Sequence, residues 1–139
     1  MTTTDDVPFR ILPRITDRNA HYWQGGRDGE LRLQRCRACG YYLHPPSVIC
    51  PKCWSKDIGV ETVSGRAEVL TFSVNHQLWM PGLEVPFVLA IVRLVEQDDL
   101  RITTNIVNCP PEAVEIGMDV HLVYLDATPE WTLFGFEPD

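Results

Sequence analysis

The chain has 139 residues, of which 45% are hydrophobic and 22% are charged, and its formal net charge is −7. This composition is typical of a soluble globular protein with one domain, or with a domain and a small appendage, and it excludes wholesale disorder. The sequence contains no apolar run of about 18 residues that could span a membrane, and its start, MTTTDDVPFR, lacks the basic and apolar regions of a secretory signal. We therefore expect a cytoplasmic protein without a membrane partner.

A short helix is the first predicted element, within a leading segment of residues 1–30. Thr16 can cap this helix, and Tyr22 and Trp23 follow before a pair of glycines interrupts it. A helix this short usually covers a hydrophobic edge of its own domain, but its aromatic side chains could instead bind a partner protein. Both interpretations stay open, and Tyr22 and Trp23 are candidate binding residues.

Four of the five cysteines form two close pairs within residues 31–62, in the stretch RCRACGYYLHPPSVICPKCW. Each C-x-x-C turn directs two sulfur atoms toward one point, so two facing turns supply four thiolates in a tetrahedral arrangement. A reducing compartment disfavours disulfides, and a thioredoxin-like redox site needs only one such pair. The spacing therefore predicts a structural zinc ribbon, in which iron could replace zinc. The expected metal ligands are Cys36, Cys39, Cys50 and Cys53.

Four thiolates leave no open coordination position, so metal-dependent hydrolysis is not expected at this centre. The alternating stretch ELRLQRC is predicted to lead into the first cysteine pair as a strand. His44 is interpreted as an imidazole at the surface or beside the ligands, and Cys109 as a small packed residue.

The remaining segment, residues 63–139, has the pattern of a small β-barrel. Alternating or β-branched runs predict five strands, and a short helical turn is predicted between the third and the fourth. The predicted strands are residues 66–77, 85–96, 100–108, 119–127 and 131–138, and the helical turn is residues 110–117. This order is typical of an OB-fold. The predicted fold class is therefore mainly β, with a short amino-terminal helix and a four-cysteine zinc ribbon followed by a five-stranded OB-fold barrel.

The loop between the first two barrel strands is apolar, although exposed loops are commonly polar. Exposed apolar patches often mark binding surfaces, whereas a loop that folds back could close one end of the barrel. Binding is favoured, because Trp and Met are enriched at interfaces. The candidate binding residues in this loop are Leu78, Trp79, Met80 and Leu83.

Several stretches together resemble one known family: YWQGGRDGELRLQRC, CRACGYYLHPPSVICPKC, VSGRAEVLTFSV and IGMDV. Their order is similar to that of the acyl-CoA-associated OB-fold family with an amino-terminal rubredoxin-like zinc ribbon, labelled domain of unknown function thirty-five. The resemblance covers residues 21–136. It implies an accessory subunit of a hetero-oligomer that docks on a thiolase-superfamily protein and helps hold a coenzyme A thioester.

The resemblance carries over the four cysteine ligands and no catalytic residue, so it implies that the chemistry belongs to the partner. Carbon–carbon bond cleavage or formation at an acyl-CoA is the reaction that it implies. Retro-aldol cleavage of steroid side chains, in a complex with a lipid-transfer-protein-like aldolase, is the first specific expectation. A thiolase or acyltransferase complex is the second.

Two other function classes remain as alternatives. Zinc ribbons and OB-folds occur in proteins that bind single-stranded nucleic acid, but a net charge of −7 would repel a polyanion, so no nucleic-acid partner is expected. An independent acyl-CoA enzyme is disfavoured, because His76 and His121 have no obvious acidic partner in the sequence. Arg66, Arg93 and Arg101 could contact coenzyme A phosphates, although isolated arginines on strands are usually solvated.

Overall fold

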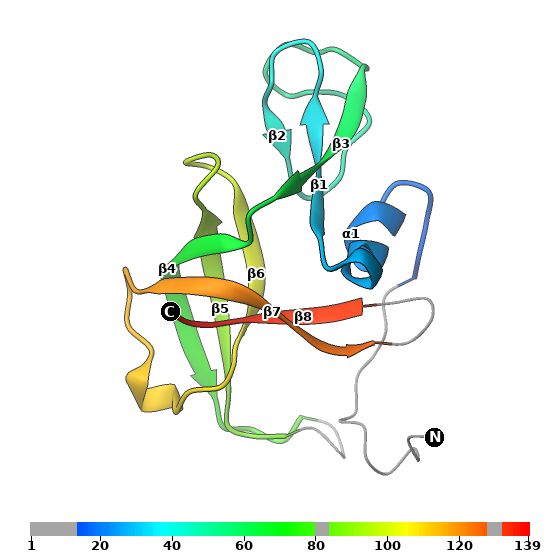
Figure 1. The fold of residues 1–139 in the computed structure, drawn as a ribbon. Coiled ribbons are helices and arrows are strands. Elements are labelled where there is room, and N and C mark those ends of the chain that lie inside the picture. Colours follow the sequence, from blue (N-terminus) through cyan, green and yellow to red (C-terminus); the bar gives the residue numbers. More distant parts are fainter. Residues whose placement is uncertain (1–13, 80–83, 128–131) are drawn as a thin grey trace.

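The computed structural model describes residues 14–79, 84–127 and 132–139. For Arg27, residues 125–127 and residues 132–133 it describes only the backbone. The strands form a three-stranded sheet and a closed five-stranded barrel (Figure 1). The small sheet stands above the barrel in this view, and a short helix lies beside both. The predicted mainly β fold, with the cysteine ribbon ahead of an OB-fold barrel, is confirmed.

The small sheet is antiparallel, with the strand order β2-β1-β3. Its strands are β1 (Leu31–Cys36), β2 (Tyr42–Leu43) and β3 (Ile58–Val63). Strand β1 corresponds to the predicted strand before the first cysteine pair. Strand β3 was not predicted, because the polar pair Glu61 and Thr62 interrupts the alternation of its apolar residues. Its pairing with β1, from Leu31 opposite Val63 onward, joins segments that are distant in the sequence.

The short helix α1 (Ala20–Gln24) continues into the 3-10 helix η1 (Gly25–Asp28). It begins later than the predicted cap at Thr16. The backbone N–H of Thr16 donates to Oδ1 of Asn19 at 2.7 Å, and the N–H of Ala20 donates to the carbonyl of Thr16 at 2.9 Å. These bonds form a separate turn ahead of the helix. Within the part of the chain that the structure describes, no helix has the length and apolar character needed to cross a bilayer.

The barrel has the strand order β4-β5-β6-β8-β7, and pairing of β7 with β4 closes it. Its elements are β4 (Arg66–Asn75), β5 (Phe87–Leu94), β6 (Arg101–Ile106), the 3-10 helix η2 (Pro111–Ala113), β7 (Asp119–Ala127) and β8 (Thr132–Pro138). Strand β8 runs parallel to β6 and antiparallel to β7. The predicted strands therefore lie where their alternation placed them, with ends shifted by a few residues.

One hydrophobic core joins the ribbon to the barrel. Leu31 and Leu33 of β1 belong to the same cluster as barrel residues such as Val69, Val92 and Phe136. Burial of each large apolar side chain contributes about 1.5 to 3 kcal/mol to stability. Because β1 also ends in the first cysteine of the ribbon, this shared core connects the position of the cysteines to the fold of the barrel.

Candidate metal centre and the surfaces around it

The four cysteines meet at one point at the end of the small sheet. Cys36 ends β1, Cys39 lies in the turn after it, and Cys50 and Cys53 lie between β2 and β3. Their sulfur atoms all lie within 4.8 Å of one another, with 3.5 Å between Cys36 and Cys53 and 3.6 Å between Cys39 and Cys50. Tetrahedral zinc with bonds of about 2.3 Å to sulfur has sulfur–sulfur edges of about 3.8 Å, so the quartet fits such an ion.

The two cysteine turns share one backbone geometry. The N–H of Gly40 donates to the carbonyl of Cys36 at 2.9 Å, and the N–H of Trp54 donates to the carbonyl of Cys50 at the same distance. Both donors have a positive φ, 82° for Gly40 and 64° for Trp54. This left-handed residue closes each turn and lets the two sulfur atoms of a pair face the same point.

The environment of Cys36 favours the thiolate that a metal requires. Its side chain is buried, and the backbone N–H of Cys39 heads the hydrogen bonds that lower the pKa of the Cys36 thiol to about 6. A closed set of four sulfur ligands leaves no position for substrate or water. The residues therefore fit a metal that holds the ribbon together and takes no part in hydrolysis.

Polar contacts hold the ribbon against the turn between β5 and β6. The hydroxyl of Tyr41 donates to Oδ2 of Asp99 at 2.6 Å, a bond that raises the pKa of Tyr41 to about 12. The backbone N–H of Tyr42 donates to Oε1 of Gln97 at 2.9 Å, and Nε2 of Gln97 donates back to the carbonyl of Tyr42 at 3.1 Å. The sequence pattern identified this turn only as a connection between strands, because no local signal shows a contact with the ribbon.

An aromatic cluster fills the junction between the helix, the ribbon and the barrel. The ring of Tyr22, only 8% exposed, lies 4.8 Å from the rings of Trp23 and His44 and 5.2 Å from that of Phe134. The helix therefore covers an edge of the chain's own core, which is one of the two alternatives that the sequence left open. Tyr22 is part of that core, and Trp23 packs partly against it.

His44 lies in this junction and is not a surface imidazole. Its Nδ1 is buried without a hydrogen-bond partner among the described residues, and so is Nε2 of His21. Burial, together with a smaller effect of the nearby charge of His21, lowers the pKa of His44 to about 4. Both histidines are therefore neutral near pH 7, and protonation places charge in a junction that offers these nitrogens no acceptor.

Acid is therefore expected to weaken the junction through His44. Because the pKa of His44 falls from 6.5 to about 4 on folding, the unfolded chain binds more protons between these values and stability falls as the pH falls. At pH 5 the loss amounts to about 2 kcal/mol relative to neutral pH. Thermal unfolding from pH 7.5 to 5 of the wild type and of His44→Phe, whose ring stays neutral, measures this difference. Parallel curves for the two proteins would contradict it, since acid release of a metal affects both alike.

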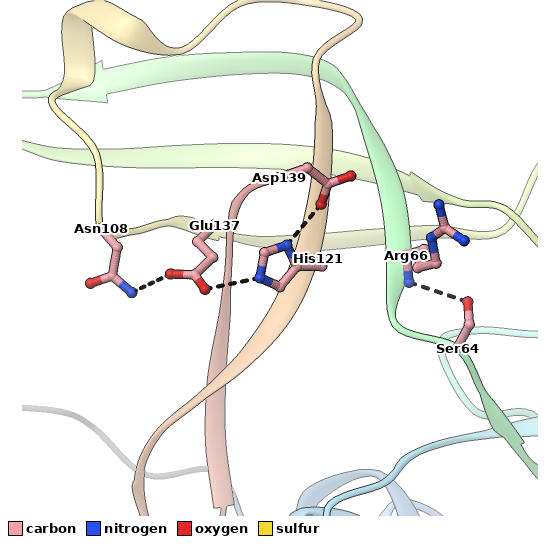
Figure 2. A network of polar contacts seen from close by, with 6 residues as sticks. All are labelled: Ser64, Arg66, Asn108, His121, Glu137 and Asp139. Atoms are coloured by element: carbon pink, nitrogen blue, oxygen red, sulfur yellow. Dashed lines mark hydrogen bonds and ion pairs between the residues drawn. The ribbon is translucent and has the colours of Figure 1, made fainter.

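His121 has two acidic partners, which corrects the expectation from the sequence (Figure 2). Its Nδ1 lies 2.7 Å from Oδ1 of Asp139, and its Nε2 lies 2.9 Å from Oε1 of Glu137, whose second oxygen accepts a bond from Asn108 at 2.7 Å. The carboxylates of Asp139 and then Glu137 raise the pKa of His121. Its contribution to stability is therefore full at low pH and is lost as the pH rises through that raised pKa.

This network fastens β8 to its neighbours. Glu137 of β8 stands opposite His121 of β7, and Asn108 follows β6. Both ring nitrogens of His121 are occupied by carboxylates, and within the network in Figure 2 no hydroxyl or thiol contacts the ring. The arrangement therefore stabilises the closed barrel and does not activate a nucleophile.

The described part of the apolar loop is exposed. Leu78 and Trp79 are 54% and 71% exposed, and the indole N–H of Trp79 donates to Oδ1 of Asn75 at 2.8 Å. This bond holds the indole nitrogen while the ring remains open to solvent. The other two candidate residues of the loop, Met80 and Leu83, lie outside the described residues.

The three arginines considered as phosphate ligands differ in their surroundings. Arg93 forms an ion pair with Glu68 at 2.8 Å. Arg66 and Arg101 are exposed, and neither forms an ion pair with another residue that the structure describes. Arg101 of β6 stands directly opposite Arg93 of β5, and Arg66 lies at the start of β4.

Comparison with known proteins identifies both parts of the chain. The family model described as "ChsH2, rubredoxin-like zinc ribbon domain" matches residues 23–59, and "ChsH2, C-terminal OB-fold domain" matches residues 60–125. A chain of a solved structure described as "Ltp2-ChsH2(DUF35) aldolase" is 38% identical, with a TM-score of 0.82 over 91% of this chain and 98% of that one.

Curated relatives include subunits of several acyl-CoA enzymes. A "Probable enoyl-CoA hydratase alpha subunit" of Thermomonospora curvata and a "3-oxo-4,17-pregnadiene-20-carboxyl-CoA hydratase alpha subunit" of Mycobacterium tuberculosis are each 38% identical over 137 residues, or 97% and 96% of this chain. The chain spans only 42% of the length of each. The "Benzoylsuccinyl-CoA thiolase subunit BbsA" of Thauera aromatica is 31% identical over 61% of this chain and 57% of its own length. The chain therefore belongs to the ChsH2/DUF35 family, whose members join a rubredoxin-like zinc ribbon to an OB-fold.

Proposed function

We propose that this chain is an accessory subunit that docks on a thiolase-superfamily protein and helps hold an acyl-CoA thioester while the partner cleaves or forms a carbon–carbon bond. The observation that carries the proposal is the match, at 38% identity, with 98% of a chain of the Ltp2-ChsH2(DUF35) aldolase. Retro-aldol cleavage of a steroid side chain is the first specific reaction, since one relative is named for a pregnadiene carboxyl-CoA. The thiolase subunit among the relatives supports a thiolase complex as the second candidate.

The described residues support a role without catalytic side chains of its own. Four of the five thiols belong to the metal centre, and burial raises the pKa of the fifth, Cys109, which disfavours its nucleophilic thiolate. His121 is engaged by two carboxylates. We therefore assign the chemistry to the partner, and the positioning of substrate and partner to this chain.

We infer that the metal is zinc and that its role is structural. Sulfur ligation alone suits zinc or iron, and the closed tetrahedral quartet suits a scaffold. When bound, the ion would cross-link the two cysteine turns, and Cys36 would transmit that constraint through β1 to the shared core. The chain's own residues would thereby hold the ribbon at a defined place beside the barrel.

The surface around Leu78 and Trp79 is the proposed path of the thioester. It combines an exposed indole ring with an exposed leucine, and it lies where β4 leaves the barrel. An adaptable apolar surface suits an acyl or pantetheine chain. We do not include Tyr22 in this path, because its side chain is only 8% exposed.

Purification of the tagged chain from its native host is expected to retain a thiolase-superfamily protein at a fixed ratio. The complex, and not the isolated zinc-loaded chain, is expected to turn over a steroid β-hydroxyacyl-CoA or another acyl-CoA, because the reacting groups belong to the partner. Mass spectrometry identifies the retained protein, and product analysis compares the complex with the isolated chain as its control.

Three outcomes would contradict the proposal in different ways. If the tagged chain elutes alone, and if acyl-CoA does not change its melting temperature, the accessory role is contradicted. Turnover by the isolated chain identifies an independent enzyme. Binding of oligonucleotides that weakens with salt identifies a nucleic-acid module.

A further inference from the structure

The second cysteine turn carries an exposed apolar surface that the metal centre does not require. Trp54 is 77% exposed, and Val48 and Ile49, just ahead of Cys50, are 59% and 37% exposed. Val48 and Ile49 directly precede Cys50, Trp54 directly follows Cys53, and the N–H of Trp54 donates to the carbonyl of Cys50 at 2.9 Å. We call Val48, Ile49 and Trp54 the knuckle patch.

Trp54 occupies a backbone position that suits glycine. The equivalent residue of the first turn is Gly40, and each donates its N–H to the carbonyl of the first cysteine of its turn. The φ of Trp54 is 64°, in the left-handed region that a bulky side chain rarely adopts. A large ring is thus held in a disfavoured conformation although it contributes little to the chain's own core. This combination is typical of a residue that serves an interaction.

The charge around the knuckle patch differs from that of the whole chain. Residues 31–56 contain five Lys or Arg and no Asp or Glu, so the rest of the chain holds seven Lys or Arg against 19 Asp or Glu. The three arginines of that segment pair with carboxylates outside it. Lys52 and Lys56, on the second turn itself, form no ion pair within the described residues, and the ammonium of Lys52 lies 5.3 Å from the centre of the Tyr41 ring. The second cysteine turn, residues 50–56, therefore carries two exposed lysines and no carboxylate on a chain whose net charge is −7.

We propose that the knuckle patch is the docking surface for the thiolase-like partner, with Trp54 as its anchor; this inference rests on the proposed function. The complementary surface is an apolar pocket that receives the indole ring and is bordered by carboxylates that face Lys52 and Lys56. Aromatic side chains in desolvated pockets carry much of the affinity of protein interfaces, and charges at the rim mainly set association rate and salt dependence.

Substitution of Trp54 by glycine separates docking from folding. Because Gly40 already fills the equivalent position, Trp54→Gly is expected to keep the metal content and the melting temperature of the wild type. Trp54→Asn provides a second variant, since Asn also tolerates a positive φ. The thiolase-like protein recovered with the tagged chain is titrated against each variant by calorimetry. Both variants are expected to weaken its binding at least 30-fold.

A matched control is Ile116→Ala. Ile116 is 69% exposed and follows η2, a turn at the end of the barrel away from the ribbon (Figure 1). The Ile116→Ala variant is expected to bind the partner with the affinity of the wild type. Lys56→Glu is expected to lower the association rate at 50 mM salt, and this difference from the wild type is expected to shrink at 500 mM.

Unchanged partner binding by Trp54→Gly and Trp54→Asn, with metal and fold intact, would overturn this inference while the accessory function still stood. Recovery of no thiolase-like protein overturns both. The wild-type chain could sediment as a dimer, and the Trp54→Gly variant as a monomer. That result would show that the knuckle patch binds a second copy of this chain, and it would also overturn the inference.

Discussion

Replacement of Cys50 by serine is expected to abolish stoichiometric metal binding and to unfold the ribbon. Cys50 is fully buried, and its sulfur lies 3.6 Å from that of Cys39 in the quartet. Structural zinc sites of this kind contribute on the order of 10 kcal/mol or more to folding, and three remaining ligands hold the ion much less tightly. Elemental analysis after extensive dialysis measures the metal, and circular dichroism with thermal unfolding measures the structure.

Cys109→Ser is the matched control for this experiment. Cys109 is partly buried against the barrel core and lies outside the quartet, so its replacement is expected to leave one metal ion per chain. A Cys50→Ser protein that keeps a full equivalent of metal and the wild-type melting temperature would show that the sulfur quartet does not hold the ribbon together. Loss of metal from both variants would show that metal binding depends on Cys109 as well as on the quartet.

Truncation of Phe136 to alanine is expected to lower the free energy of unfolding by about 3 to 5 kcal/mol. Phe136 is completely buried in β8, and its ring lies 6.2 Å from that of Phe134, at the edge of the junction with the helix. Its backbone pairs with Ile106 on one side and Leu122 on the other, where β8 closes the barrel. Urea unfolding of the metal-loaded protein, followed by tryptophan fluorescence, measures the change.

Phe136→Leu serves as the comparison, because it keeps most of the apolar volume and is expected to cost markedly less than the alanine variant. If Phe136→Ala unfolds at the same urea concentration as the wild type, the closure of the barrel does not depend on this side chain. A loss confined to partner binding, without a loss of stability, contradicts the prediction in the same way.

The convergence of the four cysteines and most of the barrel could be predicted from short stretches of sequence. Two C-x-x-C turns direct their sulfur atoms by local backbone geometry, so the spacing of Cys36, Cys39, Cys50 and Cys53 was sufficient to predict that they converge. The alternation of β5, with Val88, Ala90 and Val92 on its buried face, likewise depends on the two-residue period of a strand. These features are local, and for that reason pattern and spacing revealed them.

The surroundings of the histidines could not be predicted in this way. His121 has carboxylate partners only because β7 and β8 pair in the register that places Glu137 opposite it. Nδ1 of His44 is buried at a junction where the ring of Tyr22, from a segment distant in the sequence, packs against the imidazole. Cross-strand register and packing between remote segments are set by the whole barrel, and no single stretch of sequence contains them.

Spacing within a few tens of residues was enough to predict the convergence of the four cysteines, the order of the strands and the resemblance to a family. The remaining features depend on packing between distant segments. That packing paired β3 with β1, tied Tyr41 and Tyr42 to the turn at Gln97 and Asp99, and left Trp54 exposed while it buried Tyr22. The identity of an aromatic residue does not show whether its side chain lies inside or outside a core. Only the packing of distant segments determines this.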